Sequence, residues 1–264
     1  LLHPFLLSQG VWETVARQLA DTGRYEVFAP TMPGHNGGPR GSHWLLSAPV
    51  LADAVEQQMD ELGWDTAHIV GNSLGGWVAF ELAGRGRART VTGIAPAGGW
   101  TRWTIAKFEV ITKFLSAIPV WLTTMLLGPR ALRLPLARFL AHLPLSATPD
   151  ALTEPQLLSC LDDVSHCPAY YRLLLKTFTA PGLTRLPQTT VPAHLVNCNK
   201  DRVVPAPRFT RRFLSQLPPG LRVTTLPDVG HVPMLEAPGL VTEVITDFLE
   251  EHPGPLRAVD SAAG

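Results

Sequence analysis

The sequence predicts an α/β fold in which a mostly parallel sheet is covered by helices on both faces. Short apolar, β-branched runs alternate with longer amphipathic segments, as in repeated β–α–β units. The chain has 264 residues and is 45% hydrophobic, which is enough to bury one sizeable core. The alternation stops between Gly98 and Pro187, where only helical patterns occur. We therefore expect one core domain that carries a helical insertion.

The helices and strands of the core are predicted from apolar patterns and from the residues that begin and end them. A first helix is expected over 9–22 and a first strand over 25–29, ending at Pro30. A helix over 48–62 has Ser47 as its N-cap and stops at Gly63. The remaining predicted elements are strands at 67–70, 90–95, 193–197 and 221–226, and helices near 77–83, 206–216 and 238–251.

The insertion, residues 99–187, predicts a helical lid that follows the strand ending near residue 95. Its apolar run 104–127 is interrupted by charged residues and by Pro119, so we do not expect it to insert stably into a membrane. Further helical stretches are expected near 129–142, 154–163 and 168–178. The core then comprises 1–98 and 188–252, and residues 253–264, rich in proline, glycine and alanine, predict a flexible tail.

A G-x-S-x-G pentapeptide, Gly71–Gly75, lies between a predicted strand and a predicted helix. That setting is typical of a nucleophile elbow, where a sharp turn exposes the serine hydroxyl and small residues on either side avoid a clash. Ser73 is therefore the candidate nucleophile. A serine hydroxyl needs a histidine base, a carboxylate to orient that base, and donors for the oxyanion.

His231 is the candidate base, since it lies on a late loop that follows a predicted strand. Asp201 also follows a predicted strand, and the chain order Ser73, Asp201, His231 is the order expected for this type of triad. Asp228 is an alternative acid. It lies three residues before His231, which is too close in the chain to be sure of reaching behind the imidazole.

These motifs resemble the α/β-hydrolase fold family, and within it the lid-bearing serine hydrolases: esterases, lactonases and carbon–carbon bond hydrolases. The resemblance runs from residue 1 to about residue 251 and includes His3-Pro4-Phe5, which is similar to the family's His-Gly-x oxyanion loop. His3 is expected to anchor that loop. Proline has no N–H, so the expected oxyanion donors are the N–H groups of Leu74 and Phe5, with Leu6 as a substitute. Relatives carry further strands before this loop, which indicates that N-terminal strands are missing.

The resemblance implies an acyl-enzyme mechanism on an ester, thioester or lactone of a fairly apolar small molecule. A serine at the elbow argues against epoxide hydrolase activity, because such relatives use an aspartate there. One alternative is a carbon–carbon bond hydrolase acting on a vinylogous diketone, which an arginine facing the pocket would favour. A ligand receptor with slow turnover is another. The candidate substrate contacts are Trp77, Trp100 and Val204.

The composition of the chain limits which ligands and cofactors are expected. The formal net charge is zero, with 22 basic and 22 acidic residues spread along the chain, so nucleic acid is not an expected ligand. No G-x-G-x-x-G after a strand, Walker lysine or paired Cys/His cluster occurs, so we expect no cofactor and no metal. The three cysteines match no metal spacing and favour a reducing, cytoplasmic setting. The sequence does not determine the oligomeric state.

Overall fold

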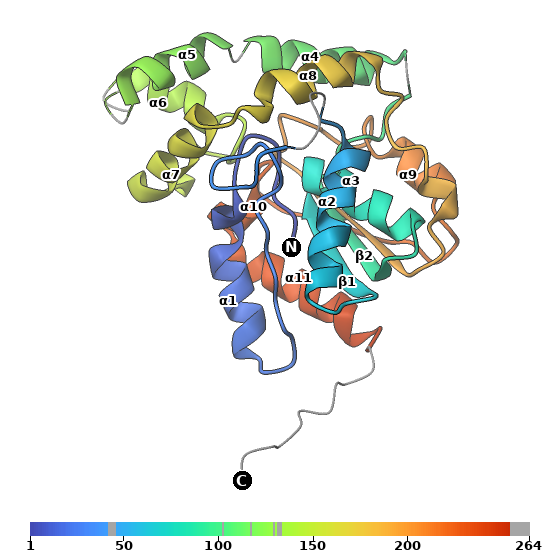
Figure 1. Cartoon of the computed structure of the whole chain (residues 1–264). Coiled ribbons are helices and arrows are strands. Elements are labelled where there is room, and N and C mark those ends of the chain that lie inside the picture. The colour runs from blue at the N-terminus through green and yellow to red at the C-terminus, as the bar shows by residue number, and fades with distance from the viewer. Residues whose placement is uncertain (42–45, 102, 117, 129, 131–133, 254–264) are drawn as a thin grey trace.

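A four-stranded parallel sheet forms the centre of the protein (Figure 1). The computed structural model describes residues 1–41, 46–101, 103–116, 118–128, 130 and 134–253, so nearly all of the predicted tail lies outside the described residues. The strands pair in chain order: β1 (Ala67–Asn72), β2 (Ala88–Ile94), β3 (Ala193–Cys198) and β4 (Arg222–Leu226). All strand pairs are parallel, as the alternating sequence predicted.

The predicted strand over 25–29 is wrong: these residues form no strand. Only Leu1 and Leu2 lie between this segment and β1, where Leu2 forms a single parallel bridge with Gly71. The amino group of Leu1 donates a 2.7 Å hydrogen bond to the Phe28 carbonyl. A strand needs a neighbour with which such bonds repeat, and a single bond does not make a strand.

Helices cover both faces of the sheet, which confirms the predicted fold class. On one face, α3 (Leu74–Gly84) packs on β1 and β2, and α2 (Ala48–Glu61) packs on α3. On the other face, α1 (Glu13–Asp21) packs against α11 (Pro238–Glu250), whose Phe248 ring lies 4.9 Å from the His194 ring of β3. Two short helices are α9 (Arg211–Gln216) and α10 (Pro233–Glu236). Helix α9 begins later than predicted, because two prolines precede it.

The segment between β2 and β3 is helical, and its helices form a separate layer at one end of the core (Figure 1). We call residues 99–187 the lid. The apolar run 104–127 forms two helices. Pro119, where the sequence indicated an interruption, lies in the first turn of the second helix, where a residue without an N–H is accepted. None of the helices among the described residues is long and apolar enough to cross a bilayer. The lid helices are α4 (Ile105–Ser116), α5 (Ile118–Leu127), α6 (Pro135–His142), α7 (Glu154–Ser165) and α8 (Ala169–Thr179).

Candidate active site

Ser73 occupies the sharp turn between β1 and α3. Its backbone angles, φ 53° and ψ −113°, lie in a region that residues with a side chain rarely adopt. The turn closes only because its flanks are glycines. A Cβ on Gly71 would lie 2.1 Å from the carbonyl oxygen of Gly75, and a Cβ on Gly75 would lie 2.2 Å from that of Leu2. The pentapeptide thus adopts the elbow geometry that its spacing indicated.

Asp201 and His231 lie on the loops that follow β3 and β4, and the structure brings them together. The His231 Nδ1 and Asp201 Oδ2 atoms are 2.8 Å apart, and both side chains are buried. The other Asp201 oxygen accepts the N–H groups of Val203 and Val204 at 2.7 and 3.0 Å. The alternative acid, Asp228, is not part of this group: its side chain is 84% exposed and faces Lys200.

Burial alone would raise the pKa of the Asp201 carboxyl. The adjacent His231 ring and the two backbone N–H donors outweigh burial, so that its pKa lies below the ordinary value. Asp201 is therefore ionised at neutral pH. Because Nδ1 of His231 bonds this carboxylate, Nε2 is the ring nitrogen left to take a proton from a substrate or nucleophile.

Ser73 and His231 line the same large cavity. Within the described part of the chain, their side chains form no direct hydrogen bond to each other. Such contacts are often long before substrate binds and tighten in the complex. Asn72, the residue before Ser73, links the end of β2 to the loop of His231, since its Nδ2 donates to the carbonyls of Ile94 at 3.0 Å and of His231 at 2.9 Å.

The loop around Phe5 lies beside the elbow. Phe5, Ser73 and Leu74 line one cavity, and neither the Phe5 nor the Leu74 backbone N–H donates to any described residue. His3 fixes this loop, as the motif indicated. Its Nε2 accepts the Met32 N–H at 2.9 Å, which leaves Nδ1 as the donor to the Pro4 carbonyl at 2.8 Å. Burial, followed by the neighbouring His35, lowers the pKa of His3, so the ring stays neutral.

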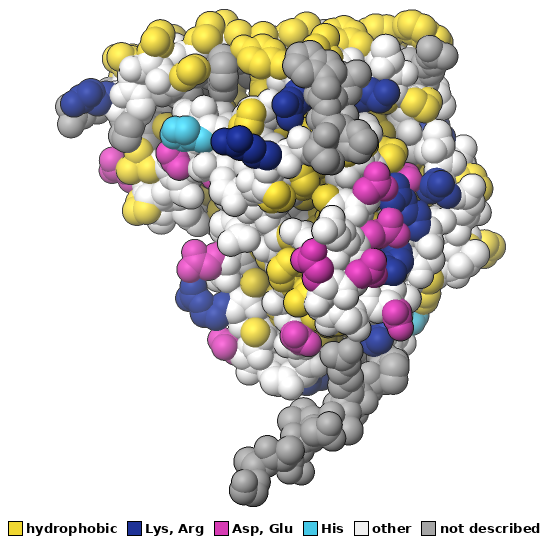
Figure 2. Space-filling view, viewed as in Figure 1, with side chains coloured by type: hydrophobic (Ala, Val, Ile, Leu, Met, Phe, Trp, Pro, Cys, Tyr) yellow, Lys and Arg dark blue, Asp and Glu magenta, His cyan; other side chains and the backbone are white. Residues whose placement is uncertain are grey.

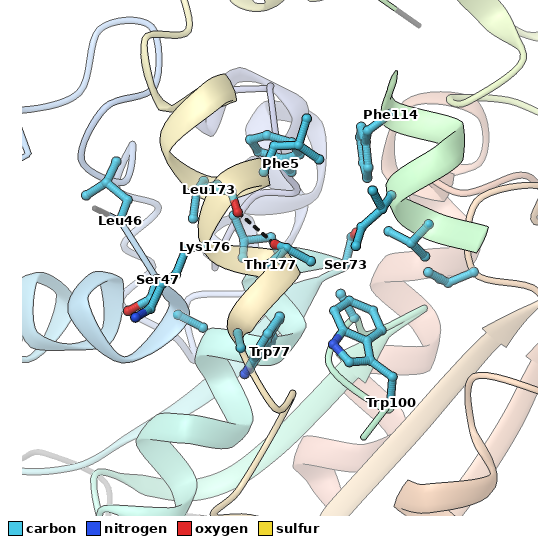
Figure 3. A pocket seen from close by; sticks show the side chains of 18 of the residues that line it. Phe5, Leu46, Ser47, Ser73, Trp77, Trp100, Phe114, Leu173, Lys176 and Thr177 are labelled. Carbon is cyan, nitrogen blue, oxygen red and sulfur yellow. Dashed lines mark hydrogen bonds between the residues drawn. The ribbon is translucent and has the colours of Figure 1, made fainter. Parts of the chain in front are cut away.

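Two cavities meet at Ser73. The smaller, about 60 Å³, is apolar, and Trp77, Trp100 and Val204 all line it (Figure 3). The rings of the two tryptophans cross at right angles, with centroids 5.3 Å apart. In Figure 3 these tryptophans lie on one side of Ser73, and Phe5 and Phe114 lie on the other. The structure therefore places all three candidate substrate contacts beside the candidate nucleophile.

The larger cavity, about 370 Å³, lies between the core and the lid. It is lined mostly by apolar side chains, together with four polar residues that sequence reasoning missed: Lys113, Ser116, Tyr170 and Arg202. The Tyr170 hydroxyl donates to the Phe114 carbonyl at 2.6 Å, and burial raises its pKa to about 12. Lys113 bonds Glu109 and the Val203 carbonyl. Only the position of Arg202 next to Asp201 offered a signal in the sequence.

The lid is bound to both loops of the acid–base pair through one short segment, Leu145–Ala147. Arg202 donates to the carbonyls of Ser146 and Ala147 at 3.2 and 3.0 Å. On the other loop, the Val232 N–H donates to the Leu145 carbonyl at 2.9 Å. We call this segment the lid bracket.

Glu236 completes the lid bracket from α10. One of its carboxylate oxygens accepts the Ala147 N–H at 3.0 Å, and the other accepts the N–H of Gly230, the residue before the candidate base. Burial raises the pKa of Glu236. Nothing in the sequence marks this role of Glu236, because Glu236 and Ala147 are 89 residues apart.

Among the described residues, no group of three or more His, Cys, Asp or Glu side chains could hold a metal ion. The three cysteines are free thiols and buried, and burial raises the pKa of each.

Comparison with known proteins identifies the class. Residues 1–244 match the model of the alpha/beta hydrolase family. The chain belongs to this family and is a hydrolase. It is 62% identical over 213 residues to epoxide hydrolase EphH of Mycobacterium tuberculosis, a match that covers 81% of this chain and all of that protein.

Solved structures show the same fold around different reactions. A thermophilic esterase from Thermogutta terrifontis matches with a TM-score of 0.71 at 20% identity, over 95% of this chain and 89% of that one. Epoxide hydrolase CorEH matches with a TM-score of 0.72 at 18% identity, over 95% and 90%. The fold alone therefore does not distinguish ester cleavage from epoxide opening.

Proposed function

We propose that this protein is a serine hydrolase that cleaves a carboxylic ester, thioester or lactone of a fairly apolar small molecule through an acyl-enzyme. One observation carries the proposal: Ser73, at a strained elbow, lines the same cavity as His231, which is oriented by a buried, ionised Asp201. The free thiols fit the reducing, cytoplasmic setting expected from the sequence.

The reaction begins when Nε2 of His231 takes the proton of Ser73 and the serine oxygen bonds the substrate carbonyl carbon. The carbonyl oxygen becomes an oxyanion, which the N–H groups of Phe5 and Leu74 stabilise; each donor lowers the barrier by about 3 kcal/mol. His231 then gives its proton to the leaving group. Water releases the acyl group by the same steps, while the ionised Asp201 stabilises the imidazolium.

The cavities indicate the kind of substrate. The apolar 60 Å³ cavity fits a short acyl group, and the 370 Å³ cavity has room for a larger leaving group. Two cations, Lys113 and Arg202, line the larger cavity, but both already bond carbonyl or carboxylate oxygens of the protein. A neutral ester therefore fits better than the anionic diketone of a carbon–carbon bond hydrolase.

Epoxide hydrolysis is the second candidate, because the M. tuberculosis relative is named for it. A serine that opened an epoxide would form an ether, which has no carbonyl for water to attack, so the enzyme would stop after one turnover. Turnover instead requires His231 to take a proton from water while the water oxygen bonds an epoxide carbon. The ring carbon–oxygen bond breaks as the new bond forms, and the ring oxygen takes a proton from the Tyr170 hydroxyl, which lines the same cavity. The proton held by His231 then returns to Tyr170 through water, which restores both residues.

One experiment separates these reactions. The purified protein is treated with a fluorophosphonate, the modified residue is found by mass spectrometry, and turnover of p-nitrophenyl esters and of styrene oxide is measured beside Ser73→Ala. We expect labelling at Ser73 alone and ester turnover that the substitution abolishes. Epoxide turnover that survives Ser73→Ala would instead support the water mechanism. A folded protein without labelling or turnover would favour a receptor.

A further inference from the structure

The outer face of the lid is apolar, whereas the rest of the surface is not. Outside the lid, only Leu62, Leu214 and Val223 are exposed large hydrophobic residues among those described. Figure 2 shows the difference as a band of hydrophobic side chains along the lid end of the molecule. The band consists of Trp103, Ile105, Phe108, Leu115, Leu122, Met125, Leu126, Leu127, Leu134, Leu136, Phe139, Tyr171, Leu175 and Phe178. Contiguous patches of this kind mark interaction surfaces.

Each of two lid helices, α8 and α4, has apolar side chains both on the face toward the cavity and on the exposed face. In α8, Leu173 and Leu174 line the small cavity, whereas Tyr171, Leu175 and Phe178 recur at helical spacing on the exposed side. α4 repeats the pattern, with Val110 and Ile111 on the cavity and Ile105, Phe108 and Leu115 exposed. α5 contains no charged residue and still exposes Met125 and Leu126. Helices that are apolar all round are normally buried, so this face requires a partner.

The distribution of charged residues in the lid indicates what kind of partner this face binds. Residues 99–148, which contain α4, α5 and α6, hold six basic residues and one acidic residue, although the whole chain is neutral. That acid, Glu109, is paired with Lys113 and Arg208. α8 adds Arg172 and Lys176 and no acid. By contrast, residues 149–166, which contain α7, hold four acids and no lysine or arginine, and α7 exposes no large hydrophobic residue.

Some cations of these segments are available for contact, whereas Lys107 is buried and Lys176 lines the small cavity. Among the ion pairs of the described residues, none involves Arg130, Arg138 or Arg172. In Figure 2, Lys and Arg side chains lie along the border of the hydrophobic band. Long basic side chains beside an apolar face place their charge at the level of lipid headgroups while the apolar side chains enter the acyl region.

We propose that the outer face of the lid docks onto a lipid surface with acidic headgroups, with α4, α5, α6 and α8 lying in the interface and none of them spanning the bilayer. A second copy of the chain fits less well, because two such faces would bring like charges together. The proposal does not depend on the chemistry at Ser73, since the docking residues Ile105, Leu126, Leu136 and Phe139 line neither cavity.

The test is flotation of the purified full chain with vesicles of phosphatidylcholine alone and of phosphatidylcholine mixed with phosphatidylglycerol. We expect binding to the mixed vesicles, weakened by salt, and little binding to phosphatidylcholine. The double variant Ile105→Ser/Leu126→Ser removes side chains that are 79% and 82% exposed, and we expect it to bind at least about tenfold more weakly. Arg130→Gln/Arg138→Gln should lose about fivefold for each cation, on the mixed vesicles only.

Matched controls keep the result interpretable. Leu214→Ser/Val223→Ser removes two exposed apolar side chains that lie outside the lid, and Ser73→Ala removes only the candidate nucleophile. Both variants should bind the vesicles as the parent does. Circular dichroism and the Tm verify folding, and the single substitutions are used if the double variant fails to fold. Binding that the lid variants leave unchanged would overturn the proposal, as would equal binding to both vesicle types. A concentration-dependent dimer without vesicle binding, lost in Ile105→Ser/Leu126→Ser, would assign the face to a second copy.

Discussion

The loops that carry the candidate triad and the lid above them are held in place by different forces. Each residue of the candidate triad is fixed by its close surroundings: a glycine-flanked turn at Ser73, two N–H donors on Asp201, and a carboxylate behind His231. The lid packs mainly through apolar helix faces and has a polar connection to the core at the lid bracket. Precise geometry is therefore concentrated where the chemistry needs it, and substitutions in the two regions should differ in kind.

The largest effect is expected from Ser73→Ala, which removes the nucleophile. Ester turnover should fall about a million-fold, the size of loss seen when a serine hydrolase loses this group. Steady-state assays with p-nitrophenyl esters measure the loss. Ser47→Ala is the control, because Ser47 lines the same small cavity and should keep the parent activity within a few-fold. A Ser73→Ala variant with near-parental ester turnover would remove the acyl-enzyme mechanism.

The elbow also predicts a stability difference. Ser73 has φ 53°, a conformation that costs a residue with a Cβ about 1 kcal/mol and glycine almost nothing. Ser73→Gly should therefore be more stable than Ser73→Ala by roughly that amount, although both are inactive. Urea unfolding of the two variants tests this. Equal midpoints would show that the turn carries no strain.

Asp201→Asn should lower ester turnover by about 10⁴-fold, because the amide cannot stabilise the imidazolium and favours the wrong ring tautomer. Asp228→Asn, at the exposed alternative acid, should leave turnover unchanged. If Asp228→Asn were the damaging change, the assignment of the acid would be reversed.

The low pKa of Asp201 also predicts how stability changes with pH. Because its folded-state pKa is depressed, the stabilisation is present above the unfolded value of about 3.9 and is lost as pH falls through the folded value. Urea midpoints between neutral and acidic pH should therefore fall more steeply for the parent than for Asp201→Asn. Parallel curves for the two proteins would contradict this.

A smaller effect is expected where the lid meets the triad. Glu236→Gln keeps the size of the side chain but leaves one amide NH₂ facing a backbone N–H, so one of the two bonds to Ala147 and Gly230 is lost. The free energy of unfolding should fall by about 2 kcal/mol. kcat should fall between about tenfold and a hundredfold, because the loop before His231 loses its anchor.

The control for that change is Glu243→Gln on the exposed side of α11, which should alter neither quantity. Lower stability with an unchanged kcat would show that Glu236 holds the lid without positioning the base.

Local sequence was sufficient to predict the sharp turn at Ser73 and the placement of Asp201 and His231 on neighbouring loops. Two glycines around Ser73 determine a turn through contacts within five residues, and strand ends placed Asp201 and His231 at one edge of a parallel sheet. The predicted strand over 25–29 failed because a strand depends on a neighbour, which propensity does not report. The lid bracket was missed for the same reason. Its bonds join residues from 55 to 89 positions apart, and nothing near Glu236 in the chain marks it.

The smallest predicted effect concerns selectivity in the small cavity. Val204 is buried there, and its N–H, which bonds Asp201, is unaffected by Val204→Ala. Removing two methyl groups should leave acetyl ester turnover nearly unchanged and raise kcat/KM for butyryl relative to acetyl esters by about threefold to tenfold. The exposed Val223→Ala is the matched control and should keep the parental ratio. If instead the ratio responds to enlargement of the 370 Å³ cavity, through Leu161→Ala, the acyl group lies on the lid side of Ser73 and the two cavities exchange roles.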